Sequence, residues 1–511
     1  MPSAAFRADT CFTPGRSSGG FGKFALFGLW LAIVVPLVLN HVFWRDEVRG
    51  LSFAIQGDTL VDMFIGLRGD AHPLLWFLLL RFGHAVAGVA TLPIMAFLVG
   101  AAAIALLIWR APFSFPIKLM LILTRFALYD FSVMARNYGI SMLLMFVFAA
   151  LYRRHQERGI WLGTTLFLLA NTNVHSMVFA WLLMIYWAAD SNTKNGRTQS
   201  SRPLIFSFIL LLAGSLLCFF TVWPTFNDDA VYTAHRDILS VVKAVLLPGY
   251  GFLVNARAGL GPQVLLSPIL FASLLGLVRH RMLLFLGTVS LVAMSLLFAL
   301  VYPGSERHIE LWLVFLVTLY WLAKSRDGVA GLQAGPAERL GGAAFATLLL
   351  AQIVMAGLQI RSELAVPASR SRDLGALIAS RPELKRAIVI ADPDYMIEAL
   401  PYYVPNPVYR LRERQFGPLV RFTKSARLDL RIADVLRDAR RLRQSYGREI
   451  LILLSHDLDP AAPARRVRQS YSWTFETNPH DVRRFLDQTT LLVRFGVAGT
   501  DESYSVYKLG R

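Results

Sequence analysis

Charged residues are scarce in this sequence, and cysteines are almost absent. Only 17% of its 511 residues are Asp, Glu, Lys or Arg, whereas 55% are hydrophobic. Soluble domains carry roughly a quarter charged residues, so the composition excludes a soluble protein and predicts an α-helical polytopic membrane protein. The two cysteines, Cys11 in the N-terminal tail and Cys218 inside an apolar run, predict no disulfide framework and no thiolate metal site.

The charge that is present has a strong positive excess. Lys and Arg total 52 against 34 Asp and Glu, which gives a formal net charge of +18. Such a charge also occurs in proteins that bind nucleic acid, but the many apolar runs favour a different partner. We expect anionic lipid head groups and phosphate-bearing lipids to be the partners, and no nucleic acid.

Long apolar runs predict about eleven membrane spans. They cover residues 24–42, 90–109, 115–131, 138–152, 160–173, 175–189, 204–223, 262–278, 282–302, 309–323 and 341–360. Residues 1–23 carry basic side chains and no small-residue cleavage site, so we predict a cytoplasmic tail followed by a retained first helix.

The apolar segment 73–88 decides the topology. If it lies along the outer surface instead of crossing, the short basic loops all fall on the cytoplasmic side, as the positive-inside rule requires. These loops lie near residues 110–118, 153–158, 194–202, 279–281 and 324–339. We therefore predict an external loop over 44–89 that ends in a membrane-surface helix.

The composition changes after residue 360, which predicts a transmembrane domain over 24–360 and an external domain over 361–511. Residues 386–392, 449–455, 491–497 and 503–509 have the pattern of strands, and residues 428–446 that of an amphipathic helix. About 150 residues suffice for one small α/β domain. On the predicted topology this domain is periplasmic, on the outer face of a bacterial inner membrane.

Acidic, basic and histidine side chains gather at the predicted external ends of the spans. They are Asp46, Glu47, Asp70, His72, Asp130, Arg136, His175, Glu306, Arg307 and His308. Arg and His can hold a phosphate, and a carboxylate can take a proton from a hydroxyl. The set therefore suits a reaction on a lipid-borne anion, whereas Arg125, inside a span, is expected to snorkel toward the external end.

Each of these residues also has a structural interpretation. Paired acids such as Asp46 and Glu47 often stand in a solvated loop, and a single histidine such as His175 often packs between helices. Arg136 can serve topology or snorkel, and Arg307 can contact lipid head groups. No single position decides the function.

The order of the motifs resembles that of GT-C glycosyltransferases. "WRDE" after the first span and "GDAHPLLWFLLLR" resemble the first external loop of the protein O-mannosyltransferase and lipid A aminoarabinose transferase families (glycosyltransferase family 39-like). "ARNYGISMLLM", "TNVHSMVFAWLL" and "ERHIELWLVFL" resemble later family motifs. Leu74 replaces the second proline of the family's His-Pro-Pro, and Met134 stands where many relatives carry an acid.

The resemblance implies a sugar transferase with a polyprenyl-phosphate-linked donor and a GT-C-type fold with external juxtamembrane helices. It implies catalytic Asp46 and Glu47, with Asp46 as the base. It also implies substrate-binding positions at Asp70, His72, Arg136, Tyr138, His175, Arg307 and His308. The acceptor would be an envelope glycan, a lipid or a protein. No cofactor is expected besides the lipid-phosphate sugar, and no His/Asp spacing demands a metal.

Two other classes remain open from the residues alone. A secondary transporter or flippase of a lipid-linked or anionic substrate would also combine many spans with buried charges, although its polar groups usually lie near the bilayer midplane. A scaffold or sensor with an external ligand-binding domain is the other alternative. It would leave the acids after the first span unexplained.

Overall fold

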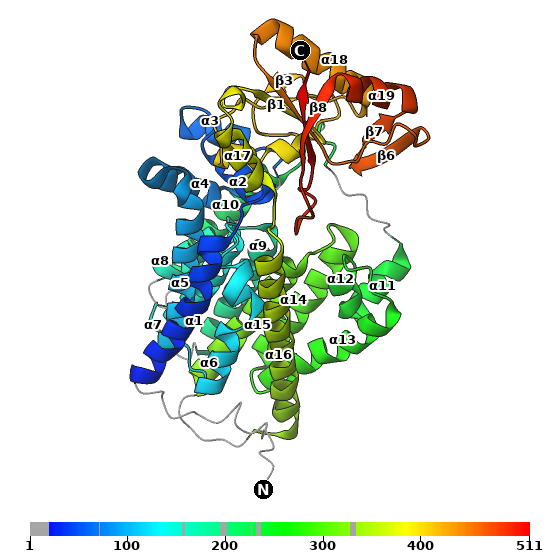
Figure 1. The fold of residues 1–511 in the computed structure, drawn as a ribbon. Helices are drawn as coiled ribbons and strands as arrows, with labels where there is room; N and C mark the ends of the chain where they lie inside the picture. The colour runs from blue at the N-terminus through cyan, green and yellow to red at the C-terminus, as the bar shows by residue number, and fades with distance from the viewer. Residues whose placement is uncertain are drawn as a thin grey trace.

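The computed structural model describes residues 20–70, 72–155, 159–194, 202–225, 227–230, 237–327 and 334–510. Most of the predicted N-terminal tail, residues 1–19, and parts of three predicted basic loops lie outside the described residues. A large helical region occupies one end of the molecule, and a smaller domain that contains the strands sits on the other end (Figure 1).

The helical region contains sixteen labelled α-helices among the described residues. They are α1 (Gly20–Asn40), α2 (Arg45–Ala54), α3 (Leu60–Gly66), α4 (Leu74–Ala87), α5 (Thr91–Arg110), α6 (Phe115–Ile122), α7 (Tyr138–His155), α8 (Ile160–Ala170), α9 (Val174–Lys194), α10 (Arg202–Val222), α11 (Ile238–Leu246), α12 (Pro248–Leu253), α13 (Leu260–Leu274), α14 (Arg281–Leu300), α15 (Glu306–Asp327) and α16 (Pro336–Ala365).

Every predicted apolar run coincides with helical structure. Six described helical segments are long and apolar enough to cross a membrane by length and composition. The other runs coincide with helices that are shorter, such as α8 with 11 residues, or that carry more polar side chains. The helices are those of an integral membrane protein, and the number of eleven spans stays a prediction.

Helix α4 covers the segment that decides the predicted topology. It continues through a short turn into α5, and the joint stretch Leu74–Arg110 is 37 residues long. At 1.5 Å per residue a straight helix of that length would far exceed the bilayer core. The chain instead turns at Gly88, whose φ is +58°. Helix α4 then lies near α2 and α3 at the end that faces the C-terminal domain (Figure 1).

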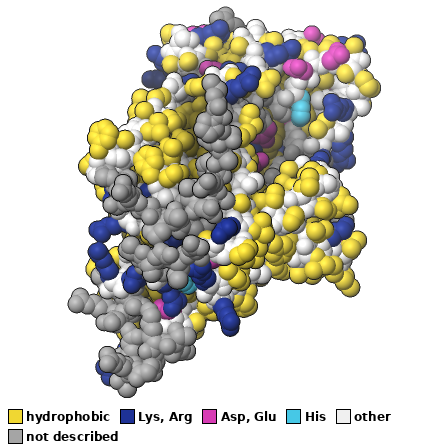
Figure 2. All heavy atoms as spheres, turned by 90° about the horizontal axis from the view of Figure 1, so that it is seen from below, with side chains coloured by type: hydrophobic (Ala, Val, Ile, Leu, Met, Phe, Trp, Pro, Cys, Tyr) yellow, Lys and Arg dark blue, Asp and Glu magenta, His cyan; other side chains and the backbone are white. Residues whose placement is uncertain are grey.

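The opposite end of the helical region is basic. Seen from that end, hydrophobic side chains cover the flanks, and Lys and Arg outnumber acidic side chains (Figure 2). Exposed examples at helix ends are Arg110, Arg154 and Arg281. This is the end predicted to face the cytoplasm.

Helix α15 lies at the centre of the helical region. Residues 310–323 are all buried, which agrees with a sequence that is apolar on every face of the helix. Its first turn, with Arg307 and His308, lies at the end that faces the C-terminal domain. The buried helix thereby fixes two of the predicted site residues in the middle of that end.

The C-terminal domain contains three small sheets and three α-helices. The strands are β1 (Ile388–Asp392), β2 (Tyr409–Arg410), β3 (Gln415–Phe416), β4 (Asp429–Arg431), β5 (Ile450–Leu454), β6 (Arg465–Ser470), β7 (Trp473–Thr477), β8 (Thr489–Arg494) and β9 (Ser505–Leu509). The helices are α17 (Ser371–Ser380), α18 (Ile432–Tyr446) and α19 (Pro479–Asp487). The largest sheet has the order β1-β5-β9-β8, in which β1 and β5 are parallel and the other pairs antiparallel.

Alternate side chains of the four-stranded sheet enter two different cores. Val389 and Leu451 pack with Leu374 of α17 on one face, and Ile390 and Ile452 belong to the core formed with α18 and α19 on the other. This follows the two-residue repeat of a strand. Three predicted strands contain β1, β5 and β9, whereas the predicted strand 491–497 overlaps β8 only in part, because β8 ends at Arg494. The predicted helix 428–446 begins four residues later, because its first residues form β4 beside β7.

Candidate active site

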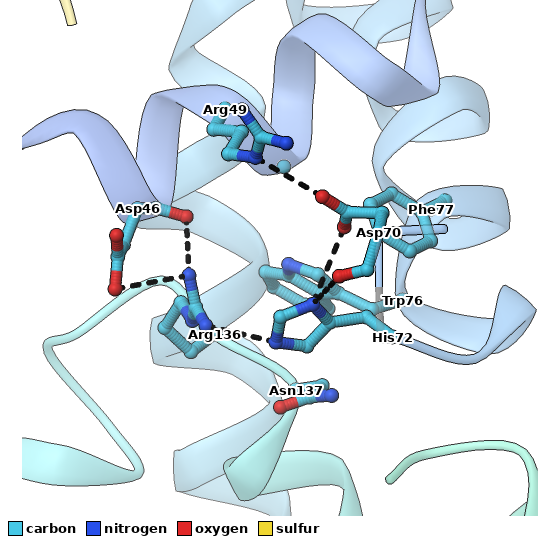
Figure 3. A pocket seen from close by; sticks show the side chains of 9 residues that line it. Asp46, Arg49, Asp70, His72, Trp76, Phe77, Arg136 and Asn137 are labelled. Carbon is cyan, nitrogen blue, oxygen red and sulfur yellow. Dashed lines mark hydrogen bonds and ion pairs between the residues drawn. The ribbon is translucent and has the colours of Figure 1, made fainter. Parts of the chain in front are cut away.

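Helix α2 places the two adjacent acids in different surroundings. Asp46 and Glu47 are the second and third residues of the helix. Successive helical residues point about 100° apart, and here only one of the pair reaches a pocket. Asp46 lines this pocket together with Arg49 and Gly50, one turn further on (Figure 3). The Asp46 side chain is 26% exposed, whereas that of Glu47 is fully buried.

Three arginines surround the Asp46 carboxylate. Its Oδ2 atom lies 3.6 Å from Nη1 of Arg136 and 3.4 Å from Nη2 of Arg307, and its Oδ1 atom lies 3.9 Å from Nε of Arg45. Burial by itself raises the pKa of Asp46, but the charges of Arg136, Arg307 and Arg45 outweigh it and hold this pKa below its usual range. Asp46 is therefore an ionised carboxylate at neutral pH.

The ion pairs of Asp46 are loose. Close charge-assisted hydrogen bonds between nitrogen and oxygen measure about 2.7–2.9 Å, shorter than either contact of the Asp46 carboxylate with Arg136 or Arg307. Arg136 makes its tighter contact with the backbone, since Nη1 donates to the Asp46 carbonyl oxygen at 2.5 Å. Both guanidinium groups can thus turn to another anion while Arg136 stays attached to α2.

The predicted Asp-x-His motif forms the opposite wall of the pocket. After α3 the chain turns at Gly69, which has a φ of +84°, and the Asp70 N–H donates to the carbonyl oxygen of Leu67 at 3.1 Å. Asp70 Oδ1 accepts a hydrogen bond from Arg49 Nε at 3.0 Å, and its Oδ2 lies 3.2 Å from Nδ1 of His72. The turn thus aims Asp70 at both α2 and His72 (Figure 3).

Both ring nitrogens of His72 have partners at the pocket. Its Nδ1 atom faces two acceptors, the carbonyl oxygen of Asp70 at 2.9 Å and the Asp70 carboxylate, so Nδ1 carries the hydrogen. Its Nε2 atom lies 3.0 Å from Nη2 of Arg136, which can only donate. The His72 ring therefore links Asp70 to Arg136.

The pocket between these walls is small. Its cavity volume is about 20 Å³, which is room for about one water molecule. The lining residues are Asp46, Arg49, Gly50, Asp70, His72, Trp76, Phe77, Arg136 and Asn137.

Arg307 marks a second group of predicted residues on the other side of Asp46. Its guanidinium carbon lies 5.8 Å from the ring centroid of Tyr138 and 5.8 Å from that of Trp44, within range of cation–π attraction. Its Nε atom is buried and has no hydrogen-bond partner among the described residues. The Arg307 side chain is 17% exposed, so its charge lies in a largely desolvated position.

His308 and His175 lie beside Tyr138. The backbone N–H of Ser305 donates to Nδ1 of His308 at 3.0 Å, so His308 carries its hydrogen on Nε2, which lies 2.9 Å from the Tyr138 hydroxyl. The ring of His175 lies 4.9 Å from that of His308. His175 is 7% exposed, and neither of its ring nitrogens has a hydrogen-bond partner in the described part of the chain.

Glu47 points away from the pocket into a buried polar cluster. Its carboxylate lies 2.9 Å from Nε2 of His41 and accepts a hydrogen bond from the backbone N–H of Ala135 at 2.7 Å. The other ring nitrogen of His41 lies 2.7 Å from Glu363 near the end of α16. Glu47 thus ties α2 to the end of α1, to α16 and to the loop that carries Arg136.

The structure thus arranges the nine predicted residues in three groups. Asp46, Asp70, His72 and Arg136 line the pocket. Tyr138, His175, Arg307 and His308 lie on the far side of Asp46, and Glu47 lies in the buried cluster behind α2. Arg49, Trp44, Trp76, Phe77 and Asn137 were not predicted. Helical spacing could have found Arg49, because residues three apart share a helix face.

The site contains cations and single carboxylates rather than a set of metal ligands. Within the described ranges, no group of three or more His, Cys, Asp or Glu side chains could hold a metal ion. The arginines that surround Asp46 supply positive charge beside its carboxylate. The arrangement suits the binding of an anion next to a carboxylate.

Sequence comparison finds no match, but the fold is similar to that of a solved structure. No protein-family model and no curated protein matches the sequence. The structure is similar to the crystal structure of ArnT from Cupriavidus metallidurans in the apo state, with a TM-score of 0.50 and 14% sequence identity. The match covers 96% of this chain and 98% of that chain. The chain therefore has an ArnT-like fold.

The likeness to ArnT includes both parts of the molecule, because it extends over nearly the whole of both chains. It confirms a mostly helical fold of the ArnT type and the C-terminal position of the sheet-containing part. At this level of identity it establishes the fold alone, so the chemistry has to be argued from the residues of the site.

Proposed function

We propose that this protein is a membrane glycosyltransferase that moves a sugar from a polyprenyl-phosphate-linked donor to an acceptor hydroxyl outside the cytoplasmic membrane. The observation that carries the proposal is the position of Asp46, an ionised carboxylate held loosely between Arg136 and Arg307 at the mouth of a pocket. A base beside two anion-binding arginines is what such a transfer needs. The ArnT-like fold supports the same class of reaction.

The step proceeds with inversion at the anomeric carbon. Asp46 takes the proton of the acceptor hydroxyl as its oxygen forms a bond to that carbon. The bond from the carbon to the phosphate oxygen breaks, and its electron pair leaves with polyprenyl phosphate. Arg307 and Arg136 stabilise the negative charge that gathers on this phosphate. No cofactor enters the step, because the donor brings its own leaving group.

Donor binding prepares the base. In the free protein Arg136 and Arg307 stabilise the ionised Asp46, which makes it a weak proton acceptor. The donor phosphate draws the two guanidinium groups toward itself and adds negative charge nearby. The pKa of Asp46 then rises toward its usual range, so the carboxylate becomes a stronger base only when the donor is in place.

The other predicted residues have supporting roles in this scheme. Asp70 and His72 hold Arg136 from the pocket side, since His72 accepts its Nη2 hydrogen. His175, with two unpartnered ring nitrogens, binds a hydroxyl or phosphate oxygen of the donor. Glu47, which was predicted as catalytic, is proposed here to position Asp46 by fixing the first turn of α2 from behind.

The cellular setting follows from the topology. We place the chain in a bacterial inner membrane, with a cytoplasmic N-terminus and with the site and the C-terminal domain in the periplasm. Nucleotide sugars are absent there, so the donor has to arrive in the lipid phase. The acceptor is an envelope glycan, a lipid or a protein.

Mass analysis of envelope glycans, lipids and proteins tests the proposal. Strains with the wild-type gene, without it and with Asp46→Asn are compared. The proposal expects one sugar substituent to disappear in both mutant strains while donor lipid accumulates. Unchanged envelope components, together with substrate uptake by vesicles that contain the protein, would identify a transporter instead.

A further inference from the structure

The C-terminal domain contacts the helix that carries Asp46. Arg45 pairs with Asp501, and its guanidinium carbon lies 4.6 Å from the ring centroid of Tyr395. Arg49, one turn further along α2, pairs with Glu398, which is 1% exposed. Both arginines of α2 therefore have partners in the C-terminal domain, on either side of Asp46.

One of these contacts continues into the pocket. Arg49 donates through Nη1 to Glu398 and through Nε to Asp70 Oδ1, the latter at 3.0 Å. Asp70 Oδ2 lies 3.2 Å from His72 Nδ1, and His72 Nε2 lies 3.0 Å from Arg136 Nη2. Arg136 Nη1 lies 3.6 Å from the Asp46 carboxylate and completes the series (Figure 3). Six side chains thus form one continuous network from the C-terminal domain to the proposed base.

We propose that Glu398 is a positioning residue for the active site, and that through it the C-terminal domain sets the arrangement of Asp70, His72 and Arg136. The proposal rests on the proposed function for the meaning of that arrangement. It assigns the C-terminal domain a part in the reaction, although Glu398 belongs to a different domain from the pocket residues.

The geometry of Arg49 explains why Glu398 matters. Its Nη1 atom is shared between the Glu398 carboxylate and the backbone carbonyl oxygen of Val420, the latter at 2.6 Å. The Val420 N–H in turn donates to Glu398 at 2.9 Å. These contacts fix the guanidinium so that its Nε points at Asp70. When the charge of Glu398 is removed, Arg49 reorients toward its remaining carboxylate, Asp70.

The consequence passes along directed hydrogen bonds. Asp70 keeps His72 in the tautomer that leaves Nε2 free to accept from Arg136. If Arg49 draws the Asp70 carboxylate away, His72 loses that partner and Arg136 loses its fixed orientation. A buried polar network of this kind is sensitive to the loss of a single partner.

The test replaces Glu398 by glutamine, which keeps the shape and an acceptor for the Val420 N–H. Asp438→Asn is the matched control, because Asp438 is also a buried acid of the C-terminal domain, 2% exposed, and pairs with Arg427 at 2.7 Å. Purified variants are assayed with a panel of polyprenyl-phosphate hexoses and pentoses and an envelope extract as acceptor. We expect Glu398→Gln to lower kcat by about 10- to 100-fold with KM within about twofold, and Asp438→Asn to leave both unchanged.

A double-mutant cycle distinguishes positioning from general damage. If Glu398 acts through His72, the double variant Glu398→Gln/His72→Ala has the same kcat as His72→Ala alone. Two effects that multiply, or a Glu398→Gln enzyme with wild-type kcat, would overturn the proposal. Equal losses in Glu398→Gln and Asp438→Asn would overturn it as well.

Amide hydrogen exchange gives a readout that needs no turnover. We expect faster amide exchange at residues 67–70 and at His72 in Glu398→Gln than in the wild type or in Asp438→Asn. Unchanged exchange contradicts the positioning role even if transfer is confirmed. An absence of transfer by the wild type, with exchange altered as expected, refutes the proposed function and leaves the link between the domains in place.

Discussion

Replacement of Arg307 tests the proposed phosphate site most sharply. Arg307 Nη2 lies 3.4 Å from the Asp46 carboxylate oxygen, and its side chain is 17% exposed. At that separation, one pair of unit charges interacts by about 5 kcal/mol for an effective dielectric constant near 20. A donor phosphate that takes the place of Asp46 beside Arg307 gains an interaction of the same order. Arg136 and the protein around it compensate for part of its loss.

We therefore expect Arg307→Ala to cost about 2–4 kcal/mol of transition-state stabilisation, which is typical of one preorganised electrostatic partner. This corresponds to a fall in kcat/KM of about 30- to 900-fold. Lysine restores little of the loss, because a point charge cannot reproduce the planar fork of the guanidinium. Both variants should keep the wild-type melting temperature to within a few degrees, since the ion pair of Arg307 with Asp46, at 3.4 Å, is longer than a close charge-assisted hydrogen bond.

The assay follows transfer against donor concentration in detergent, where bulk lipid head groups are diluted. Arg68→Ala is the control, since Arg68 is an exposed arginine at the end of α3 that contacts the ring of Phe220 and lies outside the site. If the transfer rate of Arg307→Ala depends on donor concentration as that of Arg68→Ala does, Arg307 does not bind the donor phosphate. The phosphate site would then have to lie around Arg136 alone.

Three further predictions concern the acids and the topology. Asp46→Asn should abolish most transfer at an unchanged melting temperature. Glu47→Gln should instead destabilise the fold by roughly 3–5 kcal/mol, because buried His41 loses the carboxylate of Glu47 as a partner. As the pH falls, kcat should begin to decline at a higher pH than kcat/KM. The reason is that the pKa of Asp46 is lowered in the free enzyme and rises when Arg136 and Arg307 turn to the donor phosphate. A decline of both parameters at the same pH would contradict this. In a cysteine-free background, an impermeant thiol reagent added outside should label a cysteine at Asp58 and not one at Arg154, and the reverse pattern would invert the topology.

The sequence predicted the fold correctly where physical constraints allow a segment only one kind of secondary structure. An apolar run of about twenty residues can satisfy its backbone in a membrane only as a helix, and each predicted run coincides with helical structure. Strands β1 and β5 were predicted because "IVIAD" and "ILILL" are short continuous apolar runs. Strand β6, "RRVRQS", was missed because its side chains face solvent and carry charge, so no apolar pattern marks it.

The sequence supplied candidate residues for the site but not the contacts between them. The sequence could not separate Asp46 from Glu47, because only the rotation of α2 sends one to the pocket and the other to His41. Arg125 was expected to snorkel, yet its Nε lies 2.8 Å from the buried carboxylate of Asp130. These pairings depend on how separate segments approach each other.

The proposed role of the C-terminal domain at the active site was the hardest feature to predict from the sequence. Glu398 lies 349 residues from Arg49 in the chain, and nothing in its local sequence distinguishes it from the other acids of that domain. Only the three-dimensional contact brings it to α2.

The most direct test of the central claim is sugar transfer by the purified protein. A radiolabelled sugar on polyprenyl phosphate is supplied with an envelope extract, and label in the acceptor is measured together with released polyprenyl phosphate. For the wild type we predict equal amounts of the two products, and for Asp46→Asn a rate lower by about 10²- to 10⁴-fold. Wild-type levels of both products from a folded Asp46→Asn protein, or no transfer by the folded wild type across the panel of donor sugars, would contradict the account.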